Sequence, residues 1–259
     1  MTQARKTEFV PVAIGVLLLC FLMGMVGKFA FENFPNLVSP LGGEFEWSRG
    51  TIASIYSGGG LITGLTGPIV GILFDRLGPR NVYALGIVFA GIGLTLASFA
   101  TNIWHFYFSI SLLIGFSASC CGNVPNAALA SRWFRTQIPL ALAIIYSSMG
   151  AGTLLGLSLS QILIESYGWR QAELYLGFCV FGVLALILFL PWRNIAAGSK
   201  ELSRPLTDKE LEVPEVEWTI PKALRTGSFW GLGAVFFFTG NGMFSIVIQA
   251  VTYLIEVGF

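Results

Sequence analysis

The sequence predicts an all-α membrane protein, a bundle of transmembrane helices. Three observations predict this class: an apolar composition, a series of apolar segments that are each long enough to cross a bilayer, and weak internal symmetry between two parts of the chain. Helices are expected because a helix satisfies its own backbone hydrogen bonds where no water is available. The lipid bilayer is therefore the first expected partner of this chain.

Composition separates the chain from ordinary soluble domains. Hydrophobic residues make up 54% of the 259 residues and charged residues only 11%, with a mean hydropathy of +0.74. A soluble domain carries about 25% charged residues. The formal net charge of +1 provides no basic field for nucleic acid, and the single histidine, His105, argues against a histidine-rich metal site. We expect no nucleic-acid partner, no metal and no cofactor.

Seven segments have the length of a transmembrane helix, which needs about 20 mostly apolar residues. They are Phe9–Phe31, Thr51–Phe74, Asn81–Ala100, Trp104–Ser131, Ile138–Ile164, Leu174–Trp192 and Ser228–Ile255. No Asp, Glu, Lys or Arg lies between Arg80 and Arg132, so the polar residues Thr101 and Asn102 are expected to divide two spans there.

The basic residues predict the orientation and the domains. Lysine and arginine gather in the loops on one side of the predicted spans, and short cytoplasmic loops retain positive charge, so a cytoplasmic N-terminus is predicted. Residues 1–192 are predicted to form a six-helix N-terminal bundle and 193–225 a charged cytoplasmic linker. Residues 226–259 would then form a seventh helix, the start of a truncated C-terminal bundle.

An internal repeat relates the second predicted span to the fifth. A displacement of 90 residues gives eleven identities and places Asp75 on Glu165. The identical pairs are Ala53/Ala143, Ile55/Ile145, Tyr56/Tyr146, Ser57/Ser147, Gly60/Gly150, Thr63/Thr153, Leu65/Leu155, Ile72/Ile162, Leu73/Leu163, Gly78/Gly168 and Arg80/Arg170. An odd number of crossings separates the two spans, so they run in opposite directions. Inverted repeats of this kind are typical of secondary transporters, which expose a central site to each side in turn.

The most specific local motif is GILFDRLGPRNV, residues 71–82, between the second and third predicted spans. Gly71 is expected to let another helix approach, Gly78 to permit a tight turn, and Asp75 to pair with an arginine or to cap a helix. The motif resembles the signature loop of the major facilitator superfamily, which has the form GxLaDrxGxrxv. The resemblance implies a gating loop on the cytoplasmic side, made of Gly71, Asp75, Arg76, Gly78, Arg80 and Arg132.

The resemblance extends over nearly the whole chain. Trp133-Phe134 after the fourth span and Gly168-Trp169-Arg170 between the fifth and sixth are similar to residues found at those places in the superfamily. The implied fold is a six-helix bundle built as a 3+3 inverted repeat, followed by a central loop and a seventh helix. The usual twelve helices of the superfamily imply that the chain is a fragment or a truncated product of a protein that is monomeric at full length.

A second stretch, EFEWSRGTI at residues 44–52, resembles the outer loop of monocarboxylate porters and oxalate/formate antiporters. The fifth span lacks the proline of the GxxxGPxxGG pattern of drug/proton antiporters, which disfavours drug export. The resemblance implies a plasma-membrane symporter or antiporter for a small organic anion such as a monocarboxylate. A gradient of substrate, protons or another ion would drive it, since the sequence carries no nucleotide-binding signature.

Lys28 is the one unambiguous charge deep in a predicted span. Burial of a cation there without a partner costs about 3 kcal/mol or more, so such charges usually face a cavity. One hypothesis is that Lys28 contacts a substrate carboxylate. The alternative is that it pairs with Glu32 at helical spacing or extends to the interface.

Other polar residues in the spans are candidates for the substrate site, or for hydrogen bonds between helices. They are Tyr56, Asn123, Asn126, Tyr146, Asn241 and Gln249. Two rival functions stay open, a transport-inactive scaffold or sensor of the same fold and an exporter of another substrate class. A membrane enzyme is disfavoured, because the spans contain one histidine and no clustered carboxylates.

Overall fold

The computed structural model describes residues 3–134, 137–190 and 224–239, together with the single positions 192, 195 and 222. The chain divides into two compact units, residues 1–204 and 205–259. The helices of the first unit are α1 (Gln3–Glu32), η1 (Phe34–Leu37), α2 (Val38–Phe45), α3 (Arg49–Ser98), α4 (Ile103–Phe106), η2 (Tyr107–Ile114), α5 (Gly115–Cys120), α6 (Asn123–Ser131), α7 (Ile138–Tyr167) and α8 (Trp169–Leu188). No strand occurs in the described part of the chain.

The first unit contains the six spans predicted before residue 192. Five of its helical segments are long and apolar enough to cross a membrane, and the 50-residue α3 counts twice because Gly78 interrupts it. Gly78 has φ 77° and ψ 169°, which L side chains avoid, so the tight turn expected there is confirmed. The break expected at Thr101–Asn102 is also present, where the Asn102 side chain accepts a hydrogen bond from the His105 backbone N–H.

The start of the sixth span was predicted wrongly. The sixth span was expected to begin at Leu174, but α8 already begins at Trp169. Gly168, with φ 81° and ψ 161°, ends α7 and starts α8 with no intervening loop. The polar residues Arg170 and Glu173 therefore lie inside the helix, where the hydropathy of the sequence had placed a loop.

The fourth span is broken into four helical segments. After α4, the segment η2 is π-helical, and a sharp break at Cys121–Gly122 separates α5 from α6. Pro125 lies in the first turn of α6, where a missing N–H costs nothing. Pro125 has no N–H to donate to the Cys121 carbonyl oxygen, and the Asn126 side-chain amide donates to this oxygen instead, at 3.0 Å.

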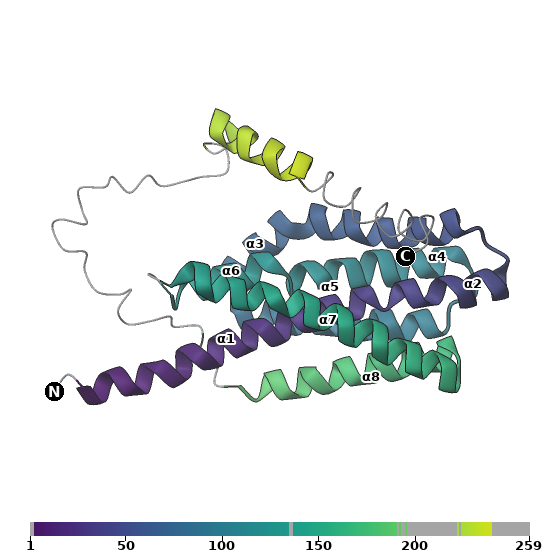
Figure 1. The fold of residues 1–259 in the computed structure, drawn as a ribbon, viewed down its shortest axis with the longest axis horizontal. Coiled ribbons are helices and arrows are strands. Elements are labelled where there is room, and N and C mark those ends of the chain that lie inside the picture. The colour runs from purple at the N-terminus through teal and green to yellow at the C-terminus, as the bar shows by residue number, and fades with distance from the viewer. Residues whose placement is uncertain are drawn as a thin grey trace, which may run out of the picture. The chain divides into compact units, whose positions relative to one another are not determined.

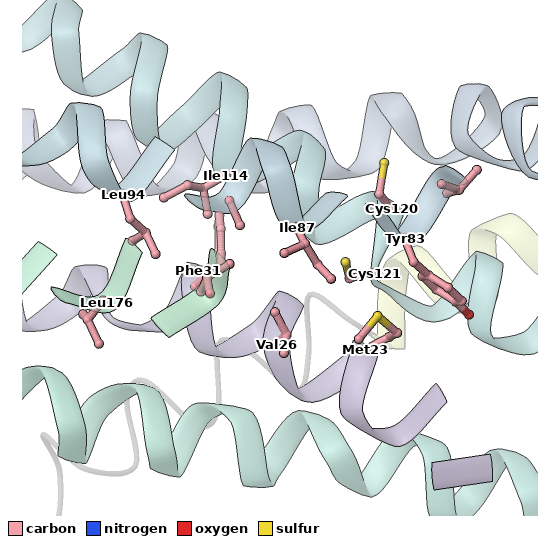
Figure 2. Close-up of a cluster of buried hydrophobic side chains, with 14 of the residues drawn as sticks. Met23, Val26, Phe31, Tyr83, Ile87, Leu94, Ile114, Cys120, Cys121 and Leu176 are labelled. Carbon is pink, nitrogen blue, oxygen red and sulfur yellow. The ribbon is translucent and has the colours of Figure 1, made fainter. Parts of the chain in front are cut away.

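The helices of the first unit pack lengthwise around an apolar core. In Figure 1, α1, α3, α7 and α8 run along the length of the bundle, with α2 and α4 at one end and α6 towards the other. Side chains from α1, α3, η2, α5 and α8 meet in the core (Figure 2). Labelled members of this cluster are Met23, Val26, Phe31, Tyr83, Ile87, Leu94, Ile114, Cys120, Cys121 and Leu176.

The second unit contains a short apolar helix, Gly227–Thr239. It begins where the seventh span was expected. The candidates Asn241 and Gln249 lie outside the described residues, as does most of the expected linker, 193–225. The domain boundaries at 192 and 225 therefore stay predictions.

Candidate functional site

Helix α1 is held against α7 by two glycines. A Cβ atom on Gly156 would lie 2.9 Å from the Phe29 carbonyl oxygen, and one on Gly152 would lie 2.9 Å from Lys28 Cβ. Neither glycine has room for a side chain, so the two backbones approach closely, as small residues allow between membrane helices. This contact fixes the part of α1 that carries Lys28.

Lys28 forms an ion pair with Glu32, one helical turn later. Its Nζ lies 2.6 Å from Glu32 Oε1, and the two side chains are 32% and 14% exposed. The Tyr56 hydroxyl, from α3, donates to the other carboxylate oxygen of Glu32 at 2.9 Å. The structure thus joins two predicted site residues, Lys28 and Tyr56, through a glutamate that the sequence analysis considered only as a partner of Lys28.

Aromatic packing fixes the position of Tyr56. Its ring lies 4.7 Å from the ring of Phe31 and 6.1 Å from that of Phe34, centroid to centroid. Because both phenylalanines sit near the end of α1, the α3 hydroxyl is directed at the last turn of that helix. The resulting cluster of Lys28, Glu32 and Tyr56 has no net charge when the two charged groups are ionised. We call it the Lys28 cluster.

Asn126 belongs to a different network. Its side chain is 1% exposed, and its Oδ1 accepts a hydrogen bond from the Tyr83 hydroxyl at 2.7 Å. Tyr83 is fully buried and lies beside Cys20 Sγ of α1, at 4.0 Å. The network joins α1, the second half of α3 and α6, so in this arrangement Asn126 connects helices and is closed off from the surface.

The remaining described candidates lie on the surface of the bundle. Asn123 opens α6 with an exposed side chain, and Tyr146 on α7 is 39% exposed. Among the described residues, no hydrogen bond or ion pair joins either of them to the Lys28 cluster. In the part of the chain that the structure describes, Tyr56 forms a side-chain hydrogen bond and its repeat counterpart Tyr146 forms none, so the pair is asymmetric.

The loop around Gly78 brings together two members of the expected gating set. Arg132, after α6, lies 3.8 Å from Asp75 and stacks its guanidinium over the ring of Phe74 at 5.0 Å. Asp75 is 78% exposed, and Arg76 and Arg80 are also exposed. Gly71 does not mark the close approach predicted for it, because a Cβ there would lie 3.7 Å from Val124 in ordinary contact.

The turn at Gly168 is bonded more tightly. Arg170 lies 2.6 Å from Glu44 of α2 and donates to the carbonyl oxygens of Ser98 at 3.0 Å and Ala100 at 2.9 Å. The indole N–H of Trp169 donates to the second Glu44 oxygen at 2.7 Å. These bonds join α2, α8 and the end of α3.

One buried acidic residue was missed from the sequence. Glu173, in the second turn of α8, is fully buried and accepts a hydrogen bond from the side-chain amide of Asn33 at 2.8 Å. The predicted start of the span at Leu174 placed Glu173 in a loop. Hydropathy alone did not point to its burial.

Comparison with known proteins decides the family. The model of the Major Facilitator Superfamily matches residues 12–259. The chain belongs to this superfamily. It is a multi-pass membrane protein, and five helical segments of its first unit are long and apolar enough to cross a membrane.

Curated relatives carry transporter names. Monocarboxylate transporter 13 of Rattus norvegicus is 30% identical over 216 residues, which cover 83% of this chain and 47% of the transporter. Probable anion transporter 4, chloroplastic, of Oryza sativa subsp. japonica is 30% identical over 79% of this chain and 33% of its own length. Riboflavin transporter RibJ of Trypanosoma cruzi is 35% identical over 53% of this chain. The chain spans about half the length of these superfamily relatives, or less.

A solved superfamily structure shares the fold. The crystal structure of a mutant peptide transporter POT in complex with alafosfalin matches with a TM-score of 0.60 at 15% identity, over 93% of this chain and 48% of that one. At this identity the likeness concerns the fold alone.

Proposed function

We propose that this superfamily member is a secondary active transporter that moves a small organic anion, such as a monocarboxylate, by alternating access. The observation that carries the proposal is the Lys28 cluster, a partly exposed cation inside an otherwise apolar span. A lysine in such a place suits the carboxylate of a substrate, since intramembrane charges are retained for function. Relatives named for monocarboxylates and for anions support the same substrate class.

Alternating access is supported by the paired turns. Gly78 and Gly168, which the internal repeat aligns, have nearly the same φ and ψ. The loop around Asp75 would then form the cytoplasmic gate, with the Asp75–Arg132 pair made and broken as the gate closes and opens. The proposal includes a cytoplasmic N-terminus in the plasma membrane, a monomeric full-length protein, no enzymatic step, and coupling to a substrate, proton or ion gradient.

The substrate would contact the Lys28 cluster from its exposed side. Because Glu32 already neutralises Lys28, an incoming carboxylate must share or displace that contact. Tyr56 is placed to hold Glu32 while Lys28 turns to the substrate. Asn241 and Gln249, which the sequence singles out, stay predicted candidates for contact with the substrate.

Uptake of radiolabelled L-lactate into proteoliposomes that hold the complete gene product tests this role. Lys28→Gln should reduce uptake at low substrate concentration about ten- to a hundred-fold, because a hydrogen bond to a charged group contributes about 1.5–3 kcal/mol. Arg49→Gln is the matched control, an exposed cation at the start of α3, and should leave uptake unchanged.

The melting temperature of each variant separates a folding defect from a binding defect. A Lys28→Gln protein that melts like the wild type and still takes up L-lactate at the wild-type rate would exclude the proposed role of Lys28. A wild-type protein that transports no carboxylate, with or without a pH gradient, would favour the scaffold or another substrate class.

A further inference from the structure

Glu173 and Asn33 form a closed polar pair between α8 and the end of α1. Glu173 is fully buried, Asn33 is 1% exposed, and a single hydrogen bond joins Asn33 Nδ2 to Glu173 Oε1 at 2.8 Å. Neither residue belongs to the expected gate or to the Lys28 cluster. A carboxyl group enclosed in this way needs a specific reason to be present.

Within the described residues, the pair leaves two buried oxygen atoms without hydrogen-bond partners. They are Glu173 Oε2 and Asn33 Oδ1, the second oxygen of the carboxyl group and the oxygen of the same amide that bonds it. Both atoms are acceptors when the carboxyl group is ionised, so they cannot bond to each other in that state. Buried polar atoms are usually paired, and an unpaired buried carboxylate is especially unfavourable.

The cations on the neighbouring elements are already engaged. Arg170, three residues before Glu173 in α8, binds Glu44 of α2 and the carbonyl oxygens that end α3. Lys28 of α1 binds Glu32, whose other oxygen accepts from Tyr56 of α3. On the α7 side, Tyr167 packs edge-to-face against Tyr175 of α8. Within the described part of the chain, no cation forms an ion pair with Glu173.

A proton bound to Glu173 would provide the donor that the two unpaired oxygen atoms lack. A proton on Oε2 turns this oxygen into a donor, and the oxygen of the amide already bonded to Glu173 lacks one, while the existing bond from Nδ2 to Oε1 is kept. A neutral carboxylic acid and a side-chain amide then form two hydrogen bonds in opposite senses. We propose that Glu173 is a proton-binding site, and that its protonated form and Asn33 make a neutral clasp between α8 and α1.

The clasp would link proton binding to the packing of this end of the bundle. Asn33 follows Glu32 directly, so the clasp lies next to the residue that holds Lys28. Loss of the proton leaves a buried anion and weakens the contact between α1 and α8, which frees the last turn of α1 to move. This step, from the clasp to the Lys28 cluster, rests on the proposed transport function; the proton site itself does not.

Glutamine at position 173 imitates the protonated acid. Its NH₂ group can donate to Asn33 Oδ1 while its oxygen accepts from Nδ2, so Glu173→Gln should melt at or above the wild-type temperature. Glu173→Ala should melt lower, because Asn33 loses both partners. The melting temperature of the wild-type protein should fall as the pH rises, because Glu173 loses its proton. The melting temperature of Glu173→Gln should not show this fall, because glutamine has no proton to lose.

Infrared spectroscopy of the full-length protein in lipid observes the proton directly. A carbonyl band of a protonated carboxylic acid, shifted by exchange into D₂O, should be present near neutral pH and lost in Glu173→Gln. Glu165→Gln, which changes an exposed glutamate of α7, is the matched control and should retain the band. The absence of a band that depends on Glu173, or a Glu173→Gln protein as unstable as Glu173→Ala, would overturn the proton site.

The two proposals fail separately. The band and the melting curves need no substrate, so they report on Glu173 even if Lys28→Gln leaves uptake of L-lactate unchanged. If the band is present and uptake depends on Lys28, Glu173→Gln should also flatten the pH dependence of uptake. An unaltered pH profile in that variant would overturn the link between the clasp and transport.

Discussion

Two ends of the first unit use the same backbone turn with different bonding. At the Gly78 end, Asp75 and Arg132 are 3.8 Å apart and Asp75 is largely exposed. At the Gly168 end, Arg170 makes a 2.6 Å pair with Glu44 and two further bonds to backbone carbonyl oxygens. The glycines at the two turns have φ values of 77° and 81°.

The difference between the two ends shows that an inverted repeat can conserve a backbone turn without conserving the side-chain bonds around it. The turn itself is local, because only glycine reaches these φ and ψ values without strain. The bonds around the turn depend on neighbours that the repeat does not duplicate. Arg170 finds Glu44 on α2, whereas the pair at the Gly78 end is formed with Arg132, which follows α6. The arginine at the Gly168 end thus joins three elements of the bundle through several short bonds, whereas the Gly78 end has one longer ion pair with a largely exposed aspartate.

The largest expected effect concerns the side of the membrane on which each end lies. Arg170 at the Gly168 end bonds Ser98 and Ala100, while Gly78 begins the helix that runs to Ser98. That helix of about 20 residues is about 30 Å long, enough to cross the bilayer. Ser131→Cys, beside Arg132, and Ser166→Cys, beside Gly168, should therefore react with an impermeant maleimide from opposite sides.

The labelling pair is matched in chemistry. Both serines are exposed and bond the carbonyl of an earlier turn, and the experiment uses a Cys179→Ala background because the other three cysteines are buried. With the N-terminus in the cytoplasm, Ser166→Cys should be labelled from outside intact cells and Ser131→Cys only after permeabilisation. Labelling of both positions from one side would show that the two ends lie on the same side of the membrane. This result would contradict the inverted repeat.

Next in size is the cost of a side chain at either turn. Gly78→Ala and Gly168→Ala should each lower the free energy of unfolding by about 1–3 kcal/mol, the usual strain of this backbone region. Gly60→Ala in α3 is the control, because its Cβ would meet open space at a helical position. Denaturant unfolding in detergent measures the three variants, and a loss at Gly168 alone would mean that the Gly78 turn can relax.

The smallest effect separates the two arginines. Arg170→Gln should cost about 1–3 kcal/mol, because buried or partly buried bonds to a charged group are lost and their acceptors are left unpaired. Arg132→Gln should cost about 0–1 kcal/mol, as for exposed ion pairs. The same unfolding measurement checks both variants. Equal losses of unfolding free energy would show that the bonds of Arg132 stabilise the Gly78 end as much as those of Arg170 stabilise the other end.

Much of the fold could be predicted because its causes are local. The length and apolarity of each segment gave the spans, and the spacing of glycine and charge in residues 71–82 gave the turn at Gly78. The start of α8 could not be predicted in this way. Hydropathy assigns Arg170 and Glu173 to a loop, and only their partners on α2, α3 and α1 make a helical, buried position tolerable.

The candidate site also contains features that could be predicted from the sequence and features that could not. The sequence singled out Lys28 and Tyr56, since a polar group in an apolar span is visible without a structure. It could not separate Asn126, which bonds Tyr83 inside the bundle, from Asn123, which is exposed three residues earlier. Membership of a span therefore did not reveal which asparagine faces another helix.

By itself the sequence determined that this chain crosses a membrane repeatedly, where its principal turn lies and to which superfamily its motif belongs. The tertiary structure alone decided that Glu32 joins Lys28 to Tyr56 and that Asn33 donates a hydrogen bond to the buried Glu173. The physical reason is that transfer into lipid depends on the composition of one segment. The environment of a single polar atom depends on which faces of two or three helices meet.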